Sequence, residues 1–339
     1  MSQTANQCRF TGRIRNVRHL ATLIKSVHYK DVAMCKISQE GLAFELEESR
    51  CLVARCLMNT QLFDDFKYTP PTAELVQRPE PSQHASFSIY NSQQGSQQIS
   101  QQIAPQPQFE HRFPSGYNSD GSVLFGVNLA TLLNCLNMFG TAGGIGSSTN
   151  HGDGSTGGTG FASAPVTAIK LTYDGIGCPF NLTLEDDGVV TTCGIPTFDP
   201  EPPVYFDFDP ESSSRIVMKA KWLEEGLRDL DATSDRVVFR FSPEIPHFRI
   251  SSLGTIETLD VNYSQGDVLQ SFNYSYDHPI EISYNFSHVL HVLRACGCAD
   301  LVNISIDNKD FMRIQFLTPL FEHKVAYSEY NFAPLEALG

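Results

Sequence analysis

The sequence lacks long hydrophobic runs. Nowhere in its 339 residues is there an uninterrupted stretch of the roughly 18 apolar residues that a membrane-spanning helix needs, so we expect no membrane segment. The N-terminal residues MSQTANQCRF contain no apolar stretch of the kind that a secretory signal requires. We therefore expect an intracellular protein, whose 41% apolar residues are sufficient to form a core.

Paired metal or disulfide motifs are also missing. The nine cysteines form no C-x-x-C pair; Cys296 and Cys298 are two apart, and the others are scattered over apolar segments. We expect reduced thiols in the core. His288 and His291 stand three apart, but no third ligand follows a metal-binding spacing, so we expect surface histidines and no metal.

The sequence contains one match to a phosphate-binding loop pattern, but its context does not fit such a loop. Residues 139–160 contain nine glycines, and GDGSTG (152–157) fits the G-x-G-x-x-G pattern. Such a loop must follow a strand and open a helix, whose N-terminus binds the phosphate. Here the predicted helix NLATLLNCLNMF precedes the glycines and the predicted strand TAIKLTYD follows them. We expect a long connection, with Phe139 and Gly140 ending the helix, and no cofactor.

Two regions of the chain each contain charged residues of only one sign. Residues 1–30 contain six Lys or Arg and no acid, whereas residues 171–214 contain nine acids and no Lys or Arg. The net charge of −14 argues against a general nucleic-acid binder. An acidic protein can still present one basic face to DNA, because salt screens the more distant acidic charges beyond about 10 Å.

What the chain does contain is a pattern that occurs twice. Apolar residues at helical spacing predict helices at 16–29, 128–139, 221–231 and 286–297, with Asn128 as an N-cap and Trp222 packing beside Leu223 and Leu227. Alternating runs predict strands at 8–14, 32–38, 41–48, 51–58, 121–127, 167–174, 179–186, 189–195, 215–220, 236–242, 247–254, 256–263, 281–285, 301–307, 312–318 and 323–330. Polar tracts at about 70–118 (Gln-rich) and 140–163 (Gly-rich) are predicted loop insertions.

This pattern predicts an α+β fold of two similar domains, each with two helices packed on antiparallel sheets. We place the first domain at 1–197 and the second at 213–339. The Pro- and acid-rich segment 198–212 is the predicted connector between them.

Cations gather on the exposed sides of the predicted helices and in the residues just before them. They are Arg13, Arg15, Arg18, Lys25, Lys219, Lys221, Arg228 and Arg294. Cations spaced along a helix can meet the phosphates of a duplex without reading its sequence. Charges on the outer face of a helix are also commonly just solvated, so these residues alone leave both interpretations open.

Several longer runs resemble a known family. The run NVRHLATLIKSVHYKDVAMCKISQEGLAFELEESRCLVARCLMNTQLFDDFK, together with VNLATLLNCLNMFG, LTYDGIGCPFNLTLEDDGVVTTCGI and GLRDLDATSDRVVFRFSPEIPHFRISSLG, is similar to the Rad-one family. Its members are subunits of the checkpoint sliding clamp, the nine-one-one complex, a relative of proliferating cell nuclear antigen. The resemblance covers most of residues 9–69 and 121–330 and departs from the family at the two insertions.

The resemblance implies a DNA-clamp protomer without catalytic residues. It would join Rad-nine-like and Hus-one-like subunits in a ring that encircles double-stranded DNA, independently of sequence. It further implies a nuclear role in the DNA-damage checkpoint and in repair, with a clamp loader as a partner.

The alternative from a different class is a metal-dependent 3′–5′ exonuclease, since this activity has been proposed within the family. Such an enzyme needs clustered carboxylates to hold divalent cations. Two acidic runs are candidates: Glu185, Asp186 and Asp187, and Asp207, Asp209 and Glu211. The first is typical of a hairpin turn and the second lies on the connector, so we expect no enzyme.

Overall fold

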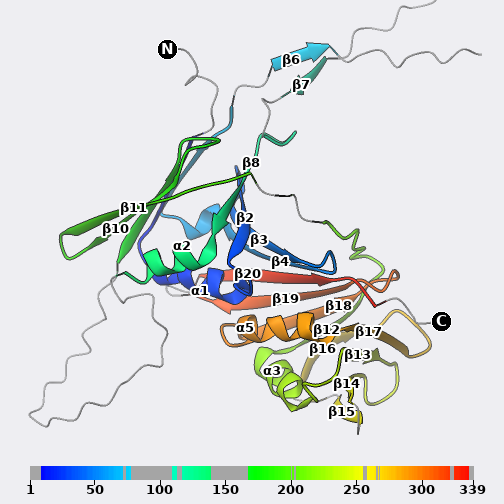
Figure 1. Ribbon diagram of the computed structural model, residues 1–339. Coiled ribbons are helices and arrows are strands. Elements are labelled where there is room, and N and C mark those ends of the chain that lie inside the picture. The colour runs from blue at the N-terminus through cyan, green and yellow to red at the C-terminus, as the bar shows by residue number, and fades with distance from the viewer. Residues whose placement is uncertain are drawn as a thin grey trace, which may run out of the picture.

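A computed structural model describes residues 9–71, 74–77, 109–112, 117–138, 167–199, 201, 204–254, 258–264, 266, 268–320 and 324–335 (Figure 1). The Gly-rich insertion expected at 140–163 lies outside the described residues, as does most of the Gln-rich one. Within the latter, β6 (Glu74–Gln77) and β7 (Phe109–Arg112) form a two-stranded antiparallel sheet that the sequence did not predict.

The two halves of the described chain repeat one order of elements, as predicted. The first half contains β1 (Arg9–Ile14), α1 (Val17–Val27), β2 (Val32–Ser38), β3 (Gly41–Glu48), β4 (Leu52–Asn59), η2 (Thr60–Leu62), β5 (Asp65–Thr69), β8 (Val123–Asn128), α2 (Leu129–Leu136), β9 (Ala168–Tyr173), β10 (Phe180–Asp186) and β11 (Val189–Ile195). The second half contains β12 (Ser214–Lys219), α3 (Ala220–Asp229), β13 (Arg236–Phe241), β14 (Phe248–Leu253), β15 (Thr258–Tyr263), β16 (Leu269–Asn273), β17 (Ile280–Asn285), α4 (Phe286–Val289), η3 (Leu290–Val292), α5 (Leu293–Cys296), β18 (Leu301–Ile306), β19 (Met312–Pro319) and β20 (Val325–Phe332).

Antiparallel sheets form the body of the molecule. One has the order β11-β10-β9-β1-β5, and another has the order β15-β14-β13-β17. The largest, β16-β12-β18-β19-β20-β4-β3-β2-β8, runs through both halves, because β20 pairs with β4 along Tyr327–Phe332. The α+β class is confirmed, and the two halves share one continuous sheet.

The helices form a row along this large sheet. α1 contacts α2 on one side and α5 on the other, and α5 contacts α3 (Figure 1). α1 packs on β4 and β20, and α3 packs on β12 and β18. The row therefore runs α2–α1–α5–α3, with its apolar stripes buried against the strands and its other side turned outward.

Three details differ from the sequence-based expectations. The fourth helix is not continuous, because a 3₁₀ turn, η3, separates α4 from α5. α2 begins after the N-cap Asn128, as predicted, but ends at Leu136 rather than near Gly140, which lies outside the described residues. β5 and β16 were not predicted, since five-residue strands with few apolar side chains give little periodicity.

The connector crosses the sheet on the face opposite the helices. Phe198 exchanges backbone hydrogen bonds with Gly126 of β8, at 2.7 and 3.2 Å. Further along, the Arg313 guanidinium lies 4.1 Å from the centre of the Phe208 ring. Lys309 donates to the Asp207 carboxylate at 2.6 Å. These contacts attach the described part of segment 198–212 to both halves.

Candidate nucleic-acid interface

α1 presents the most basic side of the helix row. The Asn16 side chain caps it by accepting a hydrogen bond from the Arg18 backbone N–H at 3.0 Å. Its buried stripe includes Leu20, Leu23 and Ile24. Arg18 and Lys25 lie on its half-exposed side, and Arg15 precedes it with 74% of its side chain exposed. α1 contains no acidic residue, and the Arg15 guanidinium before it lies 3.6 Å from the Asp64 carboxylate.

Arg13 does not lie in the helix row. It belongs to β1, where the buried positions are Phe10, Gly12 and Ile14, so its exposed side chain points to the other face of that sheet. Its register partners are Asp65 of β5 and Lys170 of β9. Arg13 is therefore separated by the sheet from the cations of α1.

α3 carries cations that are matched by acids on the same helix. Lys221 lies 3.4 Å from the Glu225 carboxylate, and Arg228 donates to Glu224 at 2.9 and 3.2 Å. Lys219 is exposed at the N-cap. Counted with its N-cap residue, α3 carries three cations and, with Asp229, three carboxylates, so their charges sum to zero.

Trp222 does not belong to the buried stripe of α3, which corrects the expectation from the sequence. Leu223 and Leu227 are buried, whereas Trp222 is 36% exposed. At about 100° per residue, Trp222 falls on the lateral side of the helix, next to Gly226. Trp222 is the feature of this surface that sequence reasoning missed.

The expectation of surface histidines on the fourth helix is wrong. His288 is buried, and His291 Nε2 lies 2.9 Å from the Glu48 carboxylate of β3 with its ring stacked on Tyr29. Burial lowers the pKa of both imidazoles, partly offset by the nearby Glu48 charge. His291 joins the two halves, and Arg294 is left as the exposed cation of α5.

α2 contributes no charge to the row. Its sequence, LATLLNCL, has no ionisable side chain besides the Cys135 thiol, and its exposed positions are Thr131 and Asn134. The structure thus brings Arg15, Arg18, Lys25, Lys219, Lys221, Arg228 and Arg294 onto one row of helices, but with unequal local charge. The largest excess of cations over acids lies on and next to α1.

The carboxylate runs do not form a metal site. Asp187 and Gly188 have positive φ in the β10–β11 hairpin, and Asp186 accepts a hydrogen bond from Thr167 at 2.9 Å. Asp207 is paired with Lys309 on the connector. Among the described residues, no group of three His, Cys, Asp or Glu side chains is placed to hold a metal ion.

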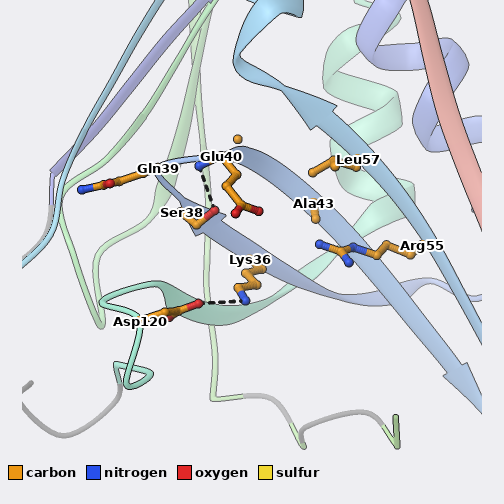
Figure 2. Close-up of a pocket in the computed structure, with 9 residues that line it drawn as sticks. Lys36, Ser38, Gln39, Glu40, Ala43, Arg55, Leu57 and Asp120 are labelled. Carbon is orange, nitrogen blue, oxygen red and sulfur yellow. Dashed lines mark hydrogen bonds and ion pairs between the residues drawn. The ribbon is translucent and has the colours of Figure 1, made fainter. Parts of the chain in front are cut away.

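A small cavity opens on the other face of the large sheet (Figure 2). It has a volume of about 190 Å³ and lies over β2, β3 and β4. Its two cations are paired with acids: Lys36 with Asp120 at 3.2 Å and Arg55 with the buried Glu45 at 3.1 Å. A cavity with internally neutralised charges, facing away from the helices, adds nothing to a nucleic-acid surface.

Comparison with known proteins agrees with this architecture. Residues 9–318 match the family model described as repair protein Rad1/Rec1/Rad17. The chain is 24% identical to the cell cycle checkpoint protein RAD1 of Homo sapiens, over 98% of this chain and 93% of that protein. It is 23% identical to the DNA damage checkpoint control protein rad1 of Schizosaccharomyces pombe, over 95% and 85%. The DNA repair exonuclease REC1 of Mycosarcoma maydis is 24% identical, over 67% and 63%.

Solved sliding clamps share the fold. Proliferating cellular nuclear antigen of Entamoeba histolytica superposes with a TM-score of 0.62 at 12% identity, over 97% of this chain and 99% of that one. The protein from Thermococcus kodakaraensis gives 0.60 at 13%, over 96% and 100%. No helix in the described part of the chain is long and apolar enough to span a membrane. The family match over most of the chain, together with the clamp fold, places this chain in the Rad1/Rec1/Rad17 repair-protein family.

Proposed function

We propose that the chain is a non-catalytic subunit of a heterotrimeric ring clamp that encircles double-stranded DNA in the nucleus. Its partners are a Rad-nine-like and a Hus-one-like subunit, a clamp loader places the ring on DNA, and the ring serves as a platform for the DNA-damage checkpoint and for repair. The observation that carries the proposal is the helix row, whose most basic member, α1, contains no acidic residue.

A ring that encloses DNA needs only weak contacts. Arg15, Arg18 and Lys25 on or next to α1 suit phosphates, which are contacted without reading base sequence. Asp207 of the connector pairs with Lys309, and the adjacent Phe208 lies against Arg313, whose neighbours Met312 and Ile314 are in the core. Asp207 therefore lies on the side of the large sheet opposite the helices and does not compete for the DNA. α1 supplies the main contact in this proposal, with α3 and Arg294 in smaller roles.

Two sheet edges that no other described strand covers support ring formation. β11 ends the five-stranded sheet beside α2, and β15 ends the four-stranded sheet beside α3, so the two edges lie at opposite ends of the helix row (Figure 1). β11 carries no charged residue, and its Val189 and Val190 side chains are exposed. An unpaired edge of this kind is an aggregation liability unless another strand covers it, and a neighbouring subunit at each end would do so.

The test is co-expression with the Rad-nine-like and Hus-one-like subunits from the same genome, followed by size-exclusion chromatography with mass measurement. We expect one species with the mass of a 1:1:1 complex, retained on closed circular DNA and released when that DNA is linearised. A chain that stays monomeric, or that forms a stable homotrimer, would overturn the heterotrimer.

The non-catalytic role has its own test, because one relative is named an exonuclease. The complex and its Asp207→Asn/Asp209→Asn variant are incubated with end-labelled DNA and Mg²⁺ or Mn²⁺. We expect no degradation above background with either protein. Metal-dependent removal of 3′ nucleotides that the variant loses would establish an enzyme instead.

A further inference from the structure

Two half-buried thiols meet where the last helix of the row packs on the edge of the five-stranded sheet. Cys135 lies in α2 and Cys193 lies in β11, and these two elements contact each other (Figure 1). Both side chains pack against the apolar core without being fully covered by it. The structure holds both as free thiols.

The strand places Cys193 on the side that α2 covers. Along β11 the side chains of Cys193 and Ile195 are covered to different degrees, whereas Thr192 between Cys193 and the hairpin is exposed. The register partner of Cys193 in β10 is Leu182, whose side chain is fully buried. Because directly opposed side chains of an antiparallel pair lie on the same face, Cys193 points to the core side of the sheet.

The helix places Cys135 at the margin of its buried stripe. Its neighbours Leu132 and Leu136 are fully buried, and Asn134 is exposed. The Cys193 thiol is a hydrogen-bonding neighbour of the Cys135 thiol. Burial, and after it this hydrogen bond and the charge of Cys193, raises the pKa of Cys135 to about 11. Cys135 is therefore a protonated thiol at neutral pH with a second sulfur beside it.

The surroundings of the pair favour a neutral product of oxidation. Neither α2 (LATLLNCL) nor β11 (VVTTCGI) carries a charged residue, so neither element supplies a cation for a thiolate or a sulfinate. A charged sulfur group would be costly in this half-buried site, whereas a disulfide is neutral and apolar. Cys35 and Cys56 differ from this pair, because Phe44 of β3 is the register partner of both and separates them.

We propose that Cys135 and Cys193 are a reversible oxidation site, which hydrogen peroxide converts into an intramolecular disulfide that links the edge strand β11 to α2. One thiolate attacks a peroxide oxygen, which gives a sulfenic acid and a hydroxide that takes up the thiol proton to form water. The second sulfur attacks the sulfenic sulfur, the S–S bond forms, and a second water leaves with the second thiol proton. The two sulfurs lose two electrons, and the peroxide gains them. Two molecules of a reducing thiol such as glutathione restore the pair by exchange and become a disulfide themselves.

The disulfide acts on the edge strand. Among the described strands β11 pairs only with β10, so local opening releases it more readily than a central strand. A covalent link to α2 removes many of the open conformations. The inference concerns the chain by itself, so its outcome and that of the ring in the proposed function are independent of each other.

Peptide mapping tests the disulfide directly. The full chain is treated with hydrogen peroxide, its remaining thiols are blocked with N-ethylmaleimide, and it is digested with a protease that cleaves before aspartate. This digest separates the peptides of Cys135, Cys193 and Cys178, which are residues 120–152, 187–198 and 174–185. We expect the first two peptides to be cross-linked, and dithiothreitol to release them.

Serine variants assign the bond. Cys135→Ser and Cys193→Ser should each abolish the cross-link. Cys178→Ser is the matched control, because Cys178 is a half-buried thiol in the connection between β9 and β10 of the same sheet, and this variant should keep the cross-link. Oxidation of Cys135 and Cys193 to separate sulfinic or sulfonic acids, or a disulfide between two chains, would overturn the inference.

Amide hydrogen exchange tests the effect on β11 and needs no variant. The reduced chain, the oxidised chain and the chain reduced again with dithiothreitol are compared. We expect the β11 amides to exchange at least about tenfold more slowly in the oxidised chain and to recover after reduction. β5, at the other edge of the same sheet, is the internal control and should not change. Equal exchange of β11 in the reduced and oxidised chains would contradict a link that restrains this strand.

Discussion

α1 and α3 occupy the same position in the two halves of the repeat but present different surfaces. Each follows the first strand of its half and buries an apolar stripe against the large sheet. α1 has a side-chain N-cap and no acid, whereas α3 has no side-chain cap and balances its cations with Glu224, Glu225 and Asp229. The buried stripe sets the fold, so the exposed positions are free to differ. α1 is therefore the more cationic of the two helices.

The strongest test of this difference is removal of the cations. We expect Arg15→Ala/Arg18→Ala/Lys25→Ala to lower the affinity of the assembled ring for duplex DNA by about 100-fold at low salt, and to reduce the slope of log K against log salt by about 3. Lys221→Ala/Arg228→Ala should change the affinity less than about fivefold, because α3 with its N-cap residue carries as many carboxylates as cations. Fluorescence anisotropy at several salt concentrations measures both quantities.

A control cation lies away from the helix row. Lys67 of β5 has 74% of its side chain exposed, and Lys67→Ala should leave DNA affinity unchanged. Equal losses from the α1 and α3 variants would contradict the difference between the two helices.

Removal of acids from α3 should raise the affinity for DNA instead of lowering it. Glu224→Gln/Glu225→Gln releases Arg228 and Lys221 from their carboxylates and makes α3 resemble α1. We expect the ring to bind duplex DNA about three- to tenfold more tightly, with a steeper salt dependence. The same anisotropy assay checks it, and unchanged affinity would place α3 too far from the DNA to contribute.

Changes to the N-caps of α1 and α3 should have smaller effects, on the free energy of unfolding. Asn16→Ala removes the α1 cap and should lower the free energy of unfolding by about 1 kcal/mol. Lys219→Asp supplies α3 with the cap that it lacks and should raise this free energy by about 0.5–1 kcal/mol. Urea unfolding with an unchanged m-value measures both, and a loss of stability in the Lys219 variant would contradict the capping account.

The smallest effect is a pH dependence at the junction of the halves. Burial lowers the pKa of His291 in the folded chain below its ordinary value of 6.5, so the unfolded chain binds the proton more readily. The contribution of neutral His291 to the free energy of unfolding is therefore fully present above about pH 6.5. It is lost as the pH falls through the pKa of His291 in the folded chain. We expect the midpoint of thermal unfolding to fall less between pH 7 and 5 in His291→Gln than in wild type. His278→Gln, at an exposed position, is the control.

Much of the fold was predictable because its signals are local. The N-cap Asn16 and the apolar spacing of Leu20 and Ile24 identify α1, and alternating patterns identify most strands. The α1 cations were found in the same way. The side of α3 on which Trp222 lies was not predictable, because a stripe of apolar residues does not distinguish a core position from its neighbour at the margin of the stripe.

The amino-acid order was sufficient for the repeated plan, the α+β class and the basic character of α1, since each depends on residues within a few positions of one another. Only the tertiary structure could join β20 to β4, place His291 against Glu48 across 243 residues, and leave β11 and β15 at edges that no other described strand covers. These contacts depend on which surfaces remain after the core is packed. No local pattern encodes them, because distant pairs are brought together by the closure of the whole sheet.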